Sequence, residues 1–264
     1  MNISEELKKL KAFRCDDRCV LSVYLNTNPA DPEQQQAAWR IYLKSGLKRL
    51  DEYLVASGNE KELSSFRSLK DKVMKEIEDK QNDLAKGAII FAAADPEIWS
   101  VHYVQVAVKT SFHWEERAMT DELEYMLKAY PEAGIILPSY SDVRILDTAM
   151  GRVHDEKVYE FDSGLDVWKE QKGVKSSIQR GVGGHTDGFD HRLKENLDRF
   201  YKDMGSVVGN MKKKRGWKEV HVAGEAELAK SFASILSEKP QSCIHKNFGK
   251  ANNNHVIQKI FESR

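Results

Sequence analysis

Short apolar runs bounded by turn residues alternate along the chain with segments of helical periodicity. The longest apolar runs, such as Gly87–Ala94 and Gly134–Pro138, are far shorter than the ~18 residues of a membrane span. Short runs of this kind between Gly, Pro, Asn and Asp residues are typical of strands. Apolar residues spaced three and four apart predict amphipathic helices between them. The pattern predicts a mixed α/β fold and argues against a membrane protein.

The first part of the chain, residues 1–115, is predicted to be one α/β domain. The run Val20–Leu25 predicts a strand. Two amphipathic helices follow, with a break at Ser57–Asn59, and the runs Gly87–Ala93 and Trp99–Val108 predict a hairpin. The first residues lack the basic and then apolar pattern of a signal peptide, so we expect a cytoplasmic protein.

The remainder, residues 116–264, is predicted to be a second α/β domain. Three short strands at Gly134–Leu137, Val143–Leu146 and Val153–Phe161 predict a meander. A helix from about residue 189 to 204 follows, and strands and helices then alternate. Three meander strands followed by helix, strand, helix and strand is the element order of an RNase H-like fold, which we expect here.

The three cysteines, Cys15, Cys19 and Cys243, are too few for a disulfide framework and odd in number. We expect them to be reduced thiols. Cys15 and Cys19 together with Cys243 and His245 could supply four zinc ligands, but their spacing matches no common zinc motif. The sequence therefore predicts no metal site and no cofactor.

The segment from residue 175 to 188 carries the clearest functional signal. Four of the eight residues from Gly181 to Gly188 are glycine. Such a stretch is costly to order and adds nothing to a core, and long loops of this kind are usually functional or disordered. A glycine-rich tip can bring bare backbone N–H groups against a phosphate or ester oxygen. From composition alone, a flexible surface loop without function remains the alternative.

Positive charge is concentrated around this segment. The whole chain has 41 basic and 41 acidic side chains, which argues against a general nucleic-acid binder. Leu165–Lys218, however, has 13 basic and 7 acidic side chains, a net charge of +6. We therefore expect contact with RNA around the glycine-rich segment.

The same segment resembles the catalytic loop of archaeo-eukaryotic class-1 peptide-chain release factors. In that family, a Gly-Arg-Gly-Gly-Gln loop precedes a helix that begins with an Arg-Phe-x-Arg-Leu-Arg-x-Glu-like sequence. Here Arg180-Gly181-Val182-Gly183-Gly184-His185 precedes a predicted helix with Phe189, Arg192, Leu193 and Glu195. The resemblance covers the second domain well and the first domain more weakly. It is strongest with the bacterial branch and its relatives in ribosome quality control.

The resemblance implies a peptidyl-tRNA hydrolase that acts on the large ribosomal subunit. Water would attack the ester between peptide and tRNA. Gly183 and Gly184 would permit the tight backbone path, and the His185 backbone N–H would stabilise the transition state. The side chains implied to contact rRNA or peptidyl-tRNA are Arg180, Arg192, Lys194 and Arg199.

Two departures from the family pattern narrow the expected function. His185 stands where the family has glutamine, which keeps the backbone N–H but introduces a side chain that titrates near neutral pH. The stop-codon motif Asn-Ile-Lys-Ser is absent, and Leu43–Gly46 is only faintly similar. The chain also ends about where the domain that binds the family's partner GTPase would begin. We therefore expect codon-independent rescue of stalled ribosomes without that GTPase.

Other interpretations stay open. Relatives in quality control cleave the tRNA near its 3′ end, a reaction that suits histidine better than glutamine. A catalytically silent ribosome-binding factor is also compatible with His185.

The basic run Lys212–Arg215 is either a solvated helix end or an RNA backbone contact. A two-metal nuclease needs converging carboxylates, but the first strand of the second domain has none, and we expect Asp142, Asp147 and Asp155 in turns or near strand ends.

Overall fold

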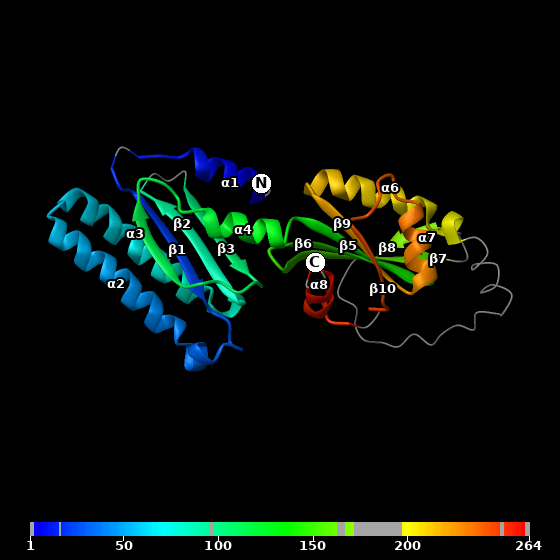
Figure 1. Cartoon of the computed structure of the whole chain (residues 1–264), viewed down its shortest axis with the longest axis horizontal. Coiled ribbons are helices and arrows are strands. Elements are labelled where there is room, and N and C mark those ends of the chain that lie inside the picture. The colour runs from blue at the N-terminus through cyan, green and yellow to red at the C-terminus, as the bar shows by residue number, and fades with distance from the viewer. Residues whose placement is uncertain are drawn as a thin grey trace. The chain divides into compact units, whose positions relative to one another are not determined.

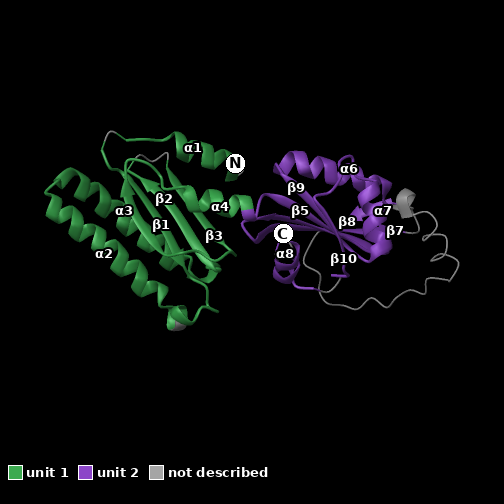
Figure 2. Ribbon diagram, viewed as in Figure 1, with its two compact units in different colours: residues 1–128 green, residues 129–264 purple. Residues whose placement is uncertain are grey.

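The computed structural model describes residues 3–15, 17–94, 98–162, 167–171, 197–248 and 251–261. The chain forms two compact units, Met1–Lys128 and Ala129–Arg264, and both are mixed α/β (Figures 1 and 2). Within the described ranges, none of the helices combines the length and the apolar character needed to cross a membrane.

The first unit is built on a four-stranded antiparallel sheet with the strand order β3-β2-β1-β4. Its strands are β1 (Val20–Asn26), β2 (Gly87–Ala93), β3 (Trp99–Val104) and β4 (Ser111–Glu115). Two long helices, α2 (Trp39–Ser57) and α3 (Glu60–Asp79), pack on one face of the sheet, where apolar side chains from both layers form a single core. Short 3-10 helices precede α2 (Pro32–Ala37) and follow α3 (Gln81–Asp83).

Two shorter helices, α1 (Ile3–Ala12) and α4 (Asp121–Ala129), are linked to the opposite face of this sheet. Side chains alternate between faces along a strand, so Tyr24 points away from the core formed by Val23 and Leu25. The Tyr24 hydroxyl donates to the carbonyl of Met119 just before α4, at 2.6 Å. On the same face, Glu6 of α1 lies 3.4 Å from His102 of β3.

The break between α2 and α3 lies where the sequence predicts it. Gly58 has a left-handed backbone conformation, with a φ of 72°, which ends α2 at low steric cost. The Asn59 side chain then accepts a hydrogen bond from the Glu62 N–H at 3.2 Å and caps α3.

The units divide after Lys128, whereas the sequence predicted a boundary after residue 115. The segment between these points is hydrogen-bonded to the first unit: the Met119 N–H donates to Ser22 Oγ, and the Cys15 N–H donates to the Glu116 carbonyl, both at 3.0 Å. The helix α4 begins only at Asp121, because Ser111–Glu115 is strand β4, paired with β1.

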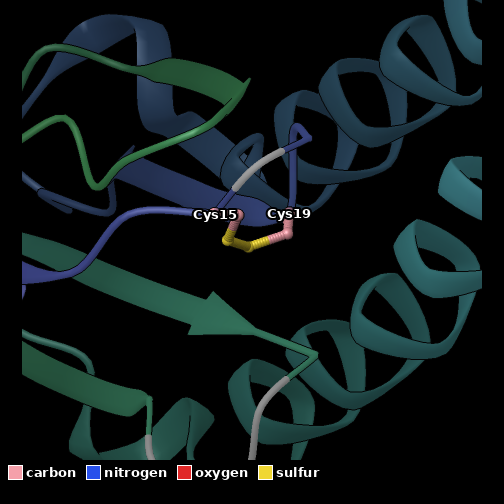
Figure 3. The surroundings of a disulfide bond; sticks show 2 residues. All are labelled: Cys15 and Cys19. Atoms are coloured by element: carbon pink, nitrogen blue, oxygen red, sulfur yellow. A yellow bond between two sulfur atoms is a disulfide. The ribbon is translucent and has the colours of Figure 1, made fainter.

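Cys15 and Cys19 form a disulfide bond, which corrects the expectation of three reduced thiols (Figure 3). Their Cα atoms are 6.2 Å apart, within the usual range for bridged cysteines. The bond closes a short loop before β1. Cys243 is a free thiol.

The second unit is built on a six-stranded sheet with the order β10-β9-β5-β6-β7-β8. Four antiparallel neighbours form one side of the sheet: β5 (Ala133–Pro138), β6 (Asp142–Ala149), β7 (Arg152–Asp162) and β8 (Val167–Glu170). On the other side, β9 (Glu219–Gly224) and β10 (Ser242–His245) run parallel to β5.

Helices cover both faces of this second sheet. The helices α6 (Leu197–Arg215) and α7 (Ala226–Ser234) pack on the face that carries Ile136 and Val222. The helix α8 (Asn253–Phe261) packs on the face that carries Ile135 and Leu137. The predicted order of meander, helix, strand, helix and strand is present, with β8 as an addition and with α6 extending to Arg215 rather than ending at residue 204.

Trp217, just after α6, joins this helix to the sheet. Its ring lies against Gly134 of β5, so closely that a Cβ atom there would be 2.3 Å from the ring. The indole N–H donates to Asp147 of β6 at 2.5 Å. Arg215 completes this Trp217 cluster, with Nε 3.5 Å from Asp147 Oδ2 and a terminal nitrogen 2.5 Å from Asp155 Oδ2 on β7. The C-terminal end of α6 is therefore attached to three strands.

The Trp217 cluster predicts opposite effects for two Gly→Ala substitutions. Gly134→Ala should lower the free energy of unfolding by about 1–3 kcal/mol, because the new methyl group overlaps the Trp217 ring. Gly209→Ala should raise it by about 0.5–1 kcal/mol, because that position in α6 opens into free space and alanine favours a helix. Urea unfolding of both variants measures these changes, and a similar sign for both would contradict the packing described here.

His221 on β9 is buried and neutral. Its Nε2–H donates to Glu219 at 3.1 Å, and its Nδ1 accepts from the Ser242 hydroxyl at 2.8 Å, so one neutral tautomer satisfies both neighbours. Burial lowers the pKa of His221 to about 4. This histidine is a structural residue rather than an exposed proton donor.

His221 takes up a proton at a higher pH in the unfolded chain than in the folded chain, because burial lowers its pKa in the folded chain. Lowering the pH should therefore destabilise the protein. The stability from neutral His221 is complete above about pH 6.5 and decreases as the pH falls towards 4, by about 2 kcal/mol at pH 5. Unfolding free energies at about pH 7 and pH 5 measure this effect. His221→Gln should remove that part of the decrease, and His245→Gln, an exposed position on β10, should not.

Candidate functional site

The residues predicted to form the catalytic loop lie outside the described part of the structure. This holds for Gly183, Gly184 and His185, for the RNA-contacting candidates Arg180, Arg192 and Lys194, and for the predicted start of the helix at Phe189. Arg199 lies within α6, but its side chain is not among those described. The structure therefore describes the two elements that flank the candidate loop, β8 before it and α6 after it.

An aromatic stack joins these two elements. The ring of Trp168 on β8 lies nearly parallel to the ring of Tyr201 on α6, with centroids 5.9 Å apart and planes inclined by 24°. The ring centroid of Phe161 on β7 lies 5.4 Å from that of Trp168, and the centroid of Phe232 on α7 lies 5.1 Å from that of Tyr201. In the sequence, the segment 172–196 thus begins and ends within a few residues of one aromatic cluster.

Tyr201 is fixed in this position by a hydrogen bond. Its side chain is fully buried, and its hydroxyl donates to the carbonyl of Ser139 at 2.6 Å, directly after β5. Burial raises the pKa of Tyr201, so the hydroxyl keeps its proton. The hydrogen bond ties the first turns of α6 to the end of β5.

Sequence reasoning missed both partners of the Trp168–Tyr201 stack. Apolar spacing predicts a helical stripe through Phe189, Leu193, Leu197, Phe200 and Met204. Met204 is buried as this stripe predicts, and the other four side chains lie outside the described part of the structure. The described buried side chains of α6 are Tyr201, Met204 and Val208. Their spacing of three and four was the available signal. β8 was missed because its four residues lie in a polar, glycine-rich region.

Two lysines on the strands that precede the loop form ion pairs with acidic side chains. Lys169 of β8 is paired with Asp162 at 2.6 Å, and Lys157 with Glu170 at 2.5 Å. The hydrogen bond that Lys157 donates to Glu170 raises the pKa of Lys157. Lys202 at the start of α6 is exposed. Of the basic side chains next to the loop in the sequence, Lys169 therefore has an acidic partner, whereas Lys202 is exposed.

Of the four basic residues in the run Lys212–Arg215 at the end of α6, two are ion-paired and two are exposed. Lys212 is paired with Glu238, and Arg215 belongs to the Trp217 cluster. Lys213 and Lys214 are exposed. Only the two middle residues of the run are both exposed and outside these ion pairs, which favours a helix end for this segment over an extended RNA contact.

The nuclease alternative gains no support from the described residues. Asp147 lies near the end of β6 and Asp155 near the start of β7, in agreement with the prediction of positions in turns or near strand ends, and both are bound by Arg215. Across the ranges that the structure describes, no three His, Cys, Asp or Glu side chains are grouped closely enough to hold a metal ion.

Comparisons with known proteins identify relatives of the chain. It is 30% identical over 243 residues to the uncharacterized protein YocB of Bacillus subtilis (strain 168), which covers 92% of each chain. Two solved structures are similar at 15% identity over 98% of this chain and 73% of the other: archaeal translation termination factor aRF1, with a TM-score of 0.35, and an archaeal protein, with a TM-score of 0.30.

The second unit matches a defined protein family. The match covers residues 131–262, which is half of the chain and includes the candidate loop. The 30% identity to YocB extends over nearly the whole length of the chain. The family match over half of the chain is sufficient to assign the protein to a family. The chain belongs to bacterial archaeo-eukaryotic release factor family 5.

Proposed function

We propose that the protein hydrolyses peptidyl-tRNA on stalled ribosomes without reading a codon. Membership of a release factor family indicates a role in translation and an interaction with the ribosome. The finer proposal assigns the reaction to Gly183, Gly184 and the backbone N–H of His185. Contacts with rRNA or tRNA are assigned to the basic side chains Arg180, Arg192, Lys194 and Arg199.

The Trp168–Tyr201 stack is the observation that supports this proposal most directly. It holds β8 and α6, the described elements before and after the candidate loop, side by side. A catalytic group on such a loop needs a rigid base, because a misplacement of about 1 Å can reduce a rate ~100-fold. The buried, hydrogen-bonded Tyr201 provides that base.

The proposed reaction is the hydrolysis of an ester. Water attacks the carbonyl carbon, the bond to the ribose oxygen breaks, and this oxygen takes up a proton to restore the tRNA 3′ end while the peptide leaves as an acid. The His185 N–H would stabilise the negative charge that develops on oxygen, and one such donor is typically worth ~2.7–4 kcal/mol. Histidine supplies this N–H as well as glutamine does.

Replacing Gly183 and Gly184 by alanine should slow peptide release about 100- to 1,000-fold, because the added methyl groups displace the backbone donor. Single-turnover release from large subunits loaded with peptidyl-tRNA measures this effect. His185→Gln retains the N–H and should release peptide at a rate close to that of the wild type. Equal rates for the wild type and the double alanine variant would contradict the proposal.

The tRNA recovered from the same reaction separates the alternatives. An intact 3′ end with free peptide supports ester hydrolysis. A shortened tRNA would instead identify cleavage near the 3′ end, with His185 as the candidate proton-transfer group. Co-sedimentation with ribosomes without either product would identify a silent binding factor. Both of the latter outcomes would overturn the proposed reaction.

The aromatic stack should affect release without taking part in the chemistry. Trp168→Ala removes one ring of the stack and should slow release about 10- to 100-fold, because the base of the loop is less well fixed. Circular dichroism and urea unfolding would check that the variant is folded. Trp99→Ala, at an exposed position on β3 of the first unit, is the matched control and should leave the rate unchanged. Equal rates for both variants would exclude a positioning role for the stack.

A further inference from the structure

The outer face of α2 carries large apolar side chains that the fold does not bury. Ile41 is 70% exposed, Tyr42 40%, Tyr53 60% and Val55 52%. The opposite face of the helix supplies Leu43, Leu47 and Leu54 to the core of the first unit. Single exposed apolar residues are common, but four on one helix face indicate an interaction surface.

The same face is strongly basic. The first twelve residues of α2, Trp39–Leu50, contain four basic and no acidic side chains, although residues 1–130 together hold 19 basic and 22 acidic ones. Lys48 is paired with Glu52 at 3.4 Å. Lys44 and Arg49 have no ion pair with any residue in the described ranges, and both are exposed. This half of the helix therefore presents positive charge on a unit that is acidic overall.

Aromatic rings and guanidinium groups alternate along this face. Tyr42, Arg49 and Tyr53 follow one another at spacings of seven and four, which places them on one side of the helix. The Arg18 guanidinium lies 5.5 Å from the centre of the Tyr53 ring. We call these four residues, Tyr42, Arg49, Tyr53 and Arg18, the Tyr–Arg stripe.

Arg18 is held in position by two constraints. Its guanidinium forms two hydrogen bonds with the buried carboxylate of Glu62, at 3.3 and 3.1 Å. It also belongs to the loop that the Cys15–Cys19 disulfide closes (Figure 3). One end of the stripe is therefore ordered before any partner binds.

We propose that the Tyr–Arg stripe binds single-stranded RNA. Aromatic rings and guanidinium planes are the groups on which unpaired bases stack, and the Arg49 guanidinium between the two rings can also neutralise a phosphate. Tyr42 and Tyr53 are eleven residues apart, or about 16 Å along the helix at ~1.5 Å per residue, which suits a segment of a few nucleotides. An acidic protein would be attracted by the charges alone, whereas the alternating planar groups favour bases.

The stripe and the candidate loop belong to different parts of the sequence. The stripe lies mostly on α2 of the first unit (Figure 2), whereas the loop falls within residues 129–264. The proposal therefore assigns a binding role to a unit that lacks the stop-codon motif, and it does not rest on peptidyl-tRNA hydrolysis.

Binding is measured by fluorescence anisotropy with the full chain and a labelled single-stranded oligoribonucleotide of mixed sequence and about 12 nucleotides. Tyr42→Ala with Tyr53→Ala should weaken binding at least ~10-fold through lost stacking. Tyr42→Phe with Tyr53→Phe keeps both rings and should bind about as well as the wild type. These are exposed positions, and circular dichroism would check that each variant is folded.

A charge control separates stacking from general attraction. Lys44→Gln with Arg49→Gln should weaken binding more than Lys72→Gln with Lys75→Gln, which removes the same charge from exposed positions on α3. Equal losses for the two pairs, or wild-type binding by the double Tyr→Ala variant, would overturn the proposal. So would binding of an RNA duplex as tight as that of the single strand. Single-turnover peptide release by the wild type, measured in parallel, distinguishes failure here from failure of the catalytic proposal.

Discussion

The buried side chain of Tyr201 links the elements on which the second unit depends. It stacks on Trp168 of β8 and contacts Phe232 of α7, and its hydroxyl donates a hydrogen bond to the carbonyl of Ser139 at the end of β5. Because the hydroxyl is buried, an unpaired state would be costly, so the hydrogen bond and the ring contacts favour the same position of α6. One side chain thus couples the sheet, two helices and the strand that precedes the candidate loop.

The opposite end of α6 is held by a different kind of interaction. There the Trp217 cluster combines a ring packed against Gly134 with hydrogen bonds and ion pairs to Asp147 and Asp155. Because both ends of α6 are attached to the sheet, the position of this helix is fixed. The candidate loop precedes α6 in the sequence, and a fixed attachment for the loop is what the proposed catalysis by a backbone N–H donor requires.

Sequence periodicity predicted the parts of this structure that bury continuous apolar surface. β1, β5, α2, α3 and the break at Gly58 lie close to the predicted positions, because each has a clear apolar run or stripe. β4 was missed because its partner β1 lies far away in the sequence, and β8 was missed because its four residues lie in a polar, glycine-rich region. The Trp168–Tyr201 stack was missed because it depends on tertiary proximity, and the Cys15–Cys19 bond because an odd number of cysteines suggested reduced thiols. The glycine-rich loop was recognisable by composition and by its resemblance to release factors, and the family assignment agrees with that resemblance.

The Cys15–Cys19 bond also changes what a break in the chain would do. The loop it closes contains Arg18, so a single backbone cut beside this residue lies inside a covalent ring. The helix α1 would stay attached to β1 through the sulfur atoms after such a cut. Release of the N-terminal helix then needs two chemical events, one on the peptide bond and one on the disulfide.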